Sequence, residues 1–221
     1  MKKTILNSLA IVALTITAMA CKGERNNETE ATEAQEVVTE VAAAKYKIDT
    51  ANSVIEWTGF KPGEKHTGTL QLQSGIVKVG ENISGTFLID MTSLTVTDLK
   101  PGKGKEGLEG HLKGSAKEKE DHFFNVAKYP TAAFEVTGLT EKEGKKIMQG
   151  NLTIRGIKKN IEFPVSYAVQ GESMSLTTEP FTINRTDWGV NYGSKSIFND
   201  LGDKFINDDI ELKISLKGIK A

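Results

Sequence analysis

The stretch that decides the fold is IEFPVSYAV, residues 161–169, in which large apolar side chains alternate with small or polar ones. A period of two is typical of a β-strand with one buried face and one solvent-exposed face. The same alternation returns in residues 210–217 (IELKISLK), and weaker forms occupy residues 83–91 and 148–154. The pattern therefore predicts antiparallel strands rather than amphipathic helices.

Short turn-like segments separate these strands. Residues 61–64, 80–82, 141–144 and 170–172 supply Gly, Pro or charged side chains between apolar runs, which favours hairpin connections. No repeat or linker divides residues 45–221, so we predict one all-β domain. Closing the sheet into an antiparallel β-barrel of about eight strands would remove its exposed edges.

Two long segments interrupt the strand pattern. In residues 97–131 we expect a weak helix at 107–112 and a short turn at 121–126. A second interruption, residues 192–207, contains Phe198, Leu201 and Phe205 and is a candidate for another short helix. The expected barrel thus has one or two short helices in its long loops.

The first twenty residues have the composition of an export signal. Lys2 and Lys3 precede an apolar run at residues 5–19, and no acidic residue occurs in residues 1–20. This run is shorter than the roughly 20 apolar residues that a transmembrane helix needs. We therefore predict a secretory signal peptide at residues 1–20.

Cys21 is the only cysteine of the chain and directly follows this segment. Ala20 and Cys21 resemble a bacterial lipobox, whose cysteine becomes the lipid-modified N-terminus after cleavage. We predict lipidation of Cys21, membrane attachment through that lipid, and a location in the bacterial cell envelope, facing the periplasm or in the outer membrane. The alternative is ordinary cleavage after Ala20, which would leave a free thiol.

Residues 21–44 differ in composition from the domain that follows. Residues 22–44 contain six Glu against Lys22 and Arg25, and no aromatic residue. Such a segment buries too little apolar surface to offset its ordering entropy, so we expect a disordered acidic tether. A solvent-exposed helix at 34–44 is the alternative. The whole chain has 28 basic and 29 acidic residues, a net charge of −1, which gives no sign of nucleic-acid binding.

Several segments, in order along the chain, resemble the YceI-like family of exported proteins. They are YKID at 46–49, SVIEW at 53–57, DMTSLTVTD at 90–98, GHLK at 110–113, DHFFNVAKYPTAAF at 121–134, NLTIRG at 151–156 and INRTDWG at 183–189. The resemblance implies a lipocalin-like barrel with an elongated apolar cavity for an isoprenoid-type chain or a similar amphiphile. Residues 114–120 form a longer loop than the family pattern leads us to expect, and we place that loop at the surface.

The candidate ligand contacts are apolar residues on the expected inner faces and in the long loops. They are Ile55, Trp57, Leu70, Phe87, Ile89, Phe123, Phe124, Phe134, Phe163, Tyr167, Trp188 and Tyr192. On the same inner faces, four glycines are expected to leave room for a ligand by removing side-chain volume: Gly59, Gly68, Gly85 and Gly150.

Arg185 and Asp187 are two residues apart in an apparent strand, so we expect both side chains on one face. An inward-facing pair would be either a structural clamp at the end of the barrel or a polar anchor for a ligand head group. A buried ion pair must satisfy itself to be tolerated.

No catalytic pattern stands out. The chain lacks a nucleophile elbow and a nucleotide-binding glycine loop, and we expect His66, His111 and His122 to lie apart, without a metal site. We therefore predict a non-enzymatic carrier or store for a lipid, without a cofactor other than the bound lipid. The alternatives are a packed barrel that acts as an envelope stress or adhesion factor, and a lipid-modifying enzyme.

Overall fold

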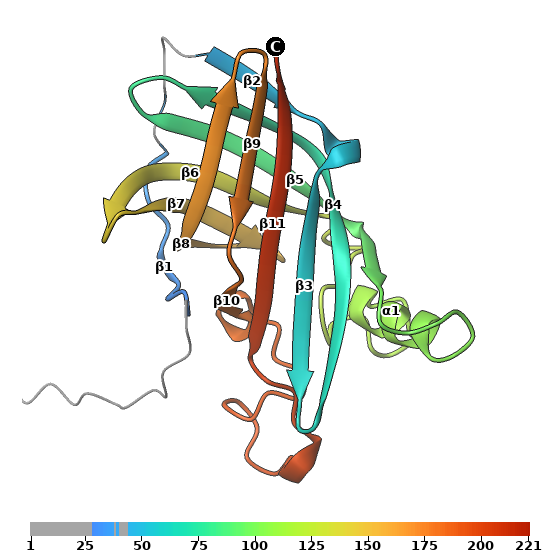
Figure 1. The fold of residues 1–221 in the computed structure, drawn as a ribbon. Helices are drawn as coiled ribbons and strands as arrows, with labels where there is room; N and C mark the ends of the chain where they lie inside the picture. Colours follow the sequence, from blue (N-terminus) through green and yellow to red (C-terminus); the bar gives the residue numbers. More distant parts are fainter. Residues whose placement is uncertain (1–27, 38, 40–43) are drawn as a thin grey trace, which may run out of the picture.

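The computed structural model describes residues 28–37, 39 and 44–221 (Figure 1). The signal peptide predicted at residues 1–20 and the predicted lipidation site, Cys21, lie outside the described residues. In the described part, eleven strands form one antiparallel sheet, so the predicted all-β class is confirmed. None of the helices described is both long enough and apolar enough to cross a bilayer.

The strands are β1 (Thr32–Glu33), β2 (Ala44–Ile48), β3 (Val54–Lys61), β4 (Glu64–Val79), β5 (Ile83–Val96), β6 (Thr131–Lys142), β7 (Lys145–Ile154), β8 (Ile157–Gln170), β9 (Ser173–Thr178), β10 (Phe181–Asn184) and β11 (Asp209–Lys220). The helices are η1 (Thr50–Asn52), α1 (Lys105–Lys113), η2 (Arg185–Trp188) and η3 (Gly202–Lys204).

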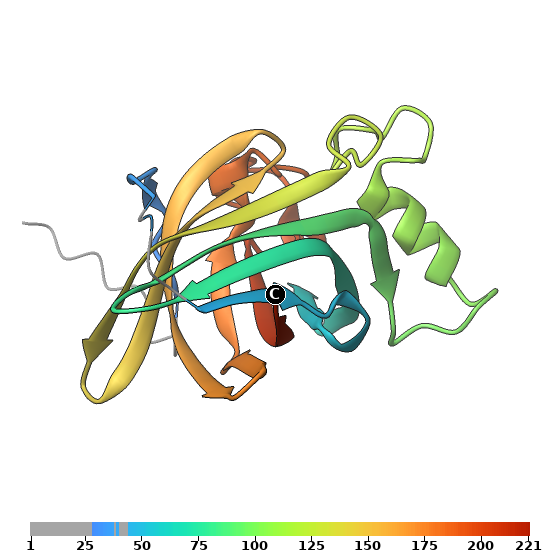
Figure 2. The ribbon, with the colours of Figure 1, turned by 90° about the horizontal axis from the view of Figure 1, so that it is seen from above.

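Eight of these strands close a ring. Each of β3, β4, β5, β6, β7, β8, β9 and β11 pairs with two neighbours in that order, and β11 pairs back to β3. Figure 2 shows the curled sheet from above, with α1 at one side. The predicted barrel of about eight strands is therefore confirmed, and β1, β2 and β10 are short additions to it.

Two positions in the ring are shared by a pair of short strands. The helix η1 separates β2 from β3, and both strands pair with β4 and β11. Glu179 and Pro180 separate β9 from β10, and proline has no N–H to continue a ladder. Strand β9 pairs with both β8 and β11, whereas β10 pairs with β11 but has no ladder with β8 among the described residues. We call this unpaired boundary between β8 and β10 the seam.

Residues 28–36, which we call the strap, lie along this seam. Thr32 and Glu33 pair with Asn160 and Lys159 of β8, and Glu28 forms a bridge to Thr182 of β10. The prediction of a disordered tether is therefore wrong for this part of residues 21–44. Composition could not reveal the strap, because its contacts are made mostly by backbone groups rather than by an apolar face.

The core side chains point into the ring, and α1 covers one end. Leu108 and Leu112, one helical turn apart, pack against the cluster that contains Leu94. The side chain of Glu109 accepts a hydrogen bond from the Val96 N–H at 2.8 Å and so ties α1 to β5. The predicted helix at 107–112 thus exists and is slightly longer. Of the loop at 114–120, only Gly114 is buried and the rest is exposed or half-exposed.

Trp188 anchors the segment after β10. Its side chain is fully buried at 0% exposure, and its indole N–H donates to the carbonyl of Leu152 at 3.0 Å. The indole N–H of Trp57 is also buried, but it has no hydrogen-bond partner among the described residues. The two tryptophans therefore differ in one interaction that can be measured.

We expect Trp188→Phe to lower the free energy of unfolding by about 1–2 kcal/mol more than Trp57→Phe, since only the first change breaks a buried hydrogen bond. Both changes delete the same atoms, so the difference isolates that bond. Urea unfolding followed by circular dichroism measures it. Equal costs for the two variants would show that the Trp188–Leu152 hydrogen bond contributes nothing.

Candidate functional site

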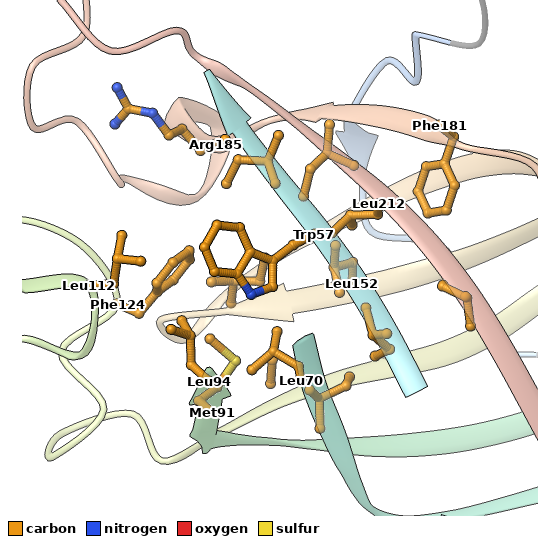
Figure 3. A pocket seen from close by; sticks show the side chains of 18 of the residues that line it. Trp57, Leu70, Met91, Leu94, Leu112, Phe124, Leu152, Phe181, Arg185 and Leu212 are labelled. Atoms are coloured by element: carbon orange, nitrogen blue, oxygen red, sulfur yellow. The ribbon is translucent and has the colours of Figure 1, made fainter. Parts of the chain in front are cut away.

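A cavity of about 300 Å³ lies inside the barrel. This volume is at the lower end of the range of about 300–1,000 Å³ that is usual for ligand pockets. Its walls come from β3–β8, β9, β10 and β11, and its open end is bordered by α1, residues 123–124 and residues 206–209. Figure 3 shows Trp57, Leu70, Leu94 and Met91 converging on this space.

Most of the predicted ligand contacts line the cavity. They are Ile55, Trp57, Leu70, Phe87, Ile89, Phe123, Phe124, Phe134 and Phe163. For the strand residues among these nine, the alternation gave the correct face, because the side-chain period of a strand is strictly two. Phe123 and Phe124 come from a loop instead and owe their position to a separate clamp.

That clamp is Arg155. Together with Gly156 it forms the two-residue turn between β7 and β8, with positive φ angles of 50° and 77°, as tight hairpins require. From this turn the Arg155 guanidinium donates to the carbonyl of Phe123 at 2.9 Å and to that of Gly189 at 3.1 Å. The loop that carries Phe123 is thereby fixed to the end of the barrel.

Three predicted contacts lie elsewhere. Tyr167 is half-buried, away from the cavity, with the Lys146 ammonium 4.3 Å from its ring centroid. Trp188 is buried in the wall and holds the chain, as described above. Tyr192 is exposed and stacks on the His122 ring at 3.9 Å. For these three residues the placement in the cavity was wrong.

Several lining residues were not among the predicted contacts. They include Met91 and Leu94 of β5, Leu108 and Leu112 of α1, Ile206 before β11, Ile210, Leu212, Ile214 and Leu216 of β11, and Leu72, Met148, Leu152, Ile161, Leu176, Phe181 and Ile183 of other strands. The spacing of Leu108 and Leu112 was a usable signal, because residues four apart share a helix face. Nothing in the sequence showed which end of the barrel the helix covers.

The expectation that four inward glycines leave free space is correct only for Gly59. A side chain at Gly59 would meet nothing within 4 Å, and Gly59 lines the cavity. The Trp57 ring occupies the space above Gly68, and the Phe134 ring occupies that above Gly150, since an added Cβ would lie 2.3 Å and 2.2 Å from them. At Gly85 an added Cβ would lie 2.8 Å from the Ile76 carbonyl oxygen. At these three glycines, neighbouring protein atoms fill the space that a side chain would occupy, and no void is left.

Polar groups in the cavity lining gather at its open end. They are the side chains of Lys61, His66, His111, Arg185, Asn207 and Asp209. His66 is not isolated: its Nδ1 lies 2.8 Å from a carboxylate oxygen of Asp98. The cavity therefore has an apolar interior and a polar rim, the arrangement that an amphiphile with a long chain requires.

Arg185 is a clamp within the protein. Its side chain is 3% exposed, and its guanidinium donates to the carbonyls of Val190, Ile206 and Asn207. A carboxylate oxygen of Asp208 lies 3.6 Å from its Nη2. These contacts use its donors to join η2 to the start of β11, which agrees with the structural alternative that we gave for this residue.

The proposed pairing geometry of Arg185 and Asp187 is wrong. Residues 185–188 form the 3₁₀ helix η2 instead of a strand, so the two-residue spacing does not place both side chains on one face. Arg185 is buried, whereas Asp187 is exposed. The ending of β10 at Asn184, whose side chain caps the turn, explains the difference.

His111 and His122, which we expected to lie apart, meet beside the open end. His111 Nε2 lies 2.8 Å from His122 Nδ1, and both rings contact Tyr192. Burial lowers the pKa of His111, and electrostatic interaction with His122 and Lys119 lowers it further. Across the described residues, no three His, Cys, Asp or Glu side chains are grouped so as to hold a metal ion.

The lowered pKa of His111 predicts a loss of stability in acid. Unfolded protein takes up a proton near the ordinary pKa of 6.5 that the folded form resists, so this contribution is complete above that pKa and declines below it. Between about pH 7 and pH 5 the wild type should lose more unfolding free energy than His111→Gln. Urea unfolding across this range measures it, and identical slopes would contradict the prediction.

Residues 46–218 match the family model of the YceI-like domain. The protein YceI of Salmonella arizonae is 25% identical over 188 residues, which cover 80% of this chain and 88% of that protein, and YceI of Salmonella newport matches equally.

Two solved structures share the fold. BcnA of Burkholderia cenocepacia has a TM-score of 0.57 at 21% identity and covers 77% of this chain and 98% of its own. A polyisoprenoid binding domain from Saccharophagus degradans has a TM-score of 0.56 at 14% identity, with 81% and 99% covered. With the domain match spanning most of the chain, we conclude that this protein belongs to the YceI-like family.

Proposed function

We propose that this protein is a lipid-anchored protein of the bacterial cell envelope that carries or stores a long-chain lipid, of isoprenoid type or another amphiphile, in its barrel. The observation that carries the proposal is the cavity, whose interior is lined by apolar side chains and whose polar groups lie at the rim. No catalytic step enters the proposal.

The physical basis of binding is burial of the chain. Each CH₂ group transferred from water into an apolar cavity contributes about 0.8 kcal/mol, so a chain of several isoprene units needs no directional bond inside the barrel. A polar head group would remain at the open end, near Lys61 and His66. Because the clamp of Arg185 is occupied by carbonyl groups, we do not assign the head group to it.

The likeness to the Saccharophagus degradans domain supports this choice of ligand class. That protein is described as a polyisoprenoid binding domain, and the two chains share a barrel fold. The packed-barrel alternative requires a filled interior, as at Gly68 and Gly150. The open space beside Gly59 favours the carrier instead.

A larger side chain at Gly59, which lines the cavity, tests the proposed carrier function. An added Cβ there would meet nothing within 4 Å. We therefore expect Gly59→Leu to lower the affinity for geranylgeraniol, an isoprenoid alcohol, by about tenfold or more while the protein stays folded. Thr58→Leu is the matched control, because Thr58 is next to Gly59 in β3 and its side chain faces the other side of the strand.

Geranylgeraniol binding is read by displacement of the fluorescent compound N-phenyl-1-naphthylamine. The carrier proposal requires that the Gly59→Leu variant binds more weakly and the Thr58→Leu variant binds like the wild type. Equal affinity in all three proteins would place the ligand outside this cavity.

The proposed anchor has its own test. Cys21→Ser removes the only thiol of the chain, so the protein should move from the membrane fraction to the soluble periplasmic fraction, since a lipid chain is what would hold it at the bilayer. Immunoblotting of the two fractions measures the shift. Unchanged partition would contradict lipidation at Cys21.

A further inference from the structure

Along the seam, no backbone hydrogen-bond ladder joins β8 directly to β10 among the described residues. On the inner side of the seam Phe163 of β8 stacks on Phe181 of β10, with ring centroids 4.4 Å apart and planes 8° from parallel. Both rings line the cavity. The inner cover of the seam is therefore a pair of side chains rather than a row of backbone hydrogen bonds.

The outer cover is the strap, residues 28–36. The N–H of Thr29 donates to the carbonyl of Thr182 at 2.9 Å, and its hydroxyl donates to the carbonyl of Glu162. These two acceptors directly adjoin Phe181 and Phe163 in the chain, so Thr29 joins the two strands behind the aromatic stack. Ala31 packs against the core cluster.

Few contacts hold the strap in place. Thr29 is 6% exposed, but most of the strap is exposed to solvent. Beyond Thr29, its attachments include the Glu28–Thr182 bridge, the packing of Ala31 and the two residue pairs with β8. They also include the Glu33–Lys159 ion pair and the hydrogen bonds between Gln35 and Asn151. Segments with little buried area and short ladders are those that open most readily by local unfolding.

We propose that the strap is a removable section of the barrel wall, and that its displacement opens the β8–β10 seam so that the lipid chain enters and leaves sideways. This inference rests on the proposed function, because it assigns an access route to the same cavity. Parting of Phe163 and Phe181 then exposes the cavity along part of its length, and the chain need not thread through the rim below α1.

The strap also lies next to the proposed anchor. Seven residue steps separate Cys21 from Glu28, and an extended chain of that length spans at most about 25 Å. An anchor at Cys21 would therefore keep the seam close to the bilayer from which a lipid is taken. The strap precedes residues 46–218, so it lies outside the part that matches the YceI-like domain.

A reversible lock tests the proposal. Glu33→Cys with Lys159→Cys joins two residues that face each other across β1 and β8, at a spacing that suits a disulfide; Cys21→Ser keeps the pair free of a third thiol. The probe is geranylgeraniol, and its rate of release into excess acceptor vesicles of phosphatidylcholine is measured with the disulfide oxidised and then reduced.

We expect oxidation to slow release by about tenfold or more and reduction to restore it, because the lock prevents local opening of the strap. The control pair Glu141→Cys and Lys146→Cys staples β6 to β7, away from the seam, and should not change the rate. Thr29→Val removes the hydroxyl that bonds Glu162 and should speed release.

Equal release rates from the oxidised and reduced proteins, with binding intact, would overturn the strap proposal and leave the carrier function standing. Absence of geranylgeraniol binding in the reduced pair and in the Cys21→Ser parent would overturn the function and the strap proposal together. Slowing by the control staple as well would also contradict a route through the β8–β10 seam.

Discussion

Closure of the sheet is the constraint on which the rest of the molecule depends. An open antiparallel sheet of this length would present unpaired edges and could not enclose a volume, whereas a ring of eight strands directs every second side chain toward one interior. Here β11 closes the ring by pairing with both β3 and β9. The cavity is a consequence of that closure, since its walls are the inward faces of the strands.

The ring is less complete at one position than elsewhere, and the departures from regularity collect there. After Pro180 the chain continues as β10, and η2 follows directly. The Arg185 guanidinium then donates hydrogen bonds to the carbonyls of Ile206 and Asn207, just before β11. The strap covers the gap that remains beside β8. The carrier that we propose needs a wall that is closed on average and open at times, and the short exposed strap would satisfy both needs.

The regular parts of the fold were predictable because a strand has only one side-chain period. Ile55, Phe87 and Phe163 could be placed inside the barrel from alternation alone. Asp187 could not, because η2 replaces the expected strand, and the Phe134 ring over Gly150 could not, because it depends on cross-strand register. The strap escaped prediction because several of its contacts, such as that of the Thr29 N–H with the Thr182 carbonyl, use backbone groups that any sequence possesses.

The central claim is that the barrel encloses a lipid chain. Native mass spectrometry of the protein, isolated from its own envelope without delipidating solvent, tests it most directly. We expect one bound molecule per chain, released at modest collision energy and identified by its fragments as a long apolar chain with a small polar head. A single species at the mass of the protein alone, unchanged after incubation with isoprenoid alcohols, would contradict it.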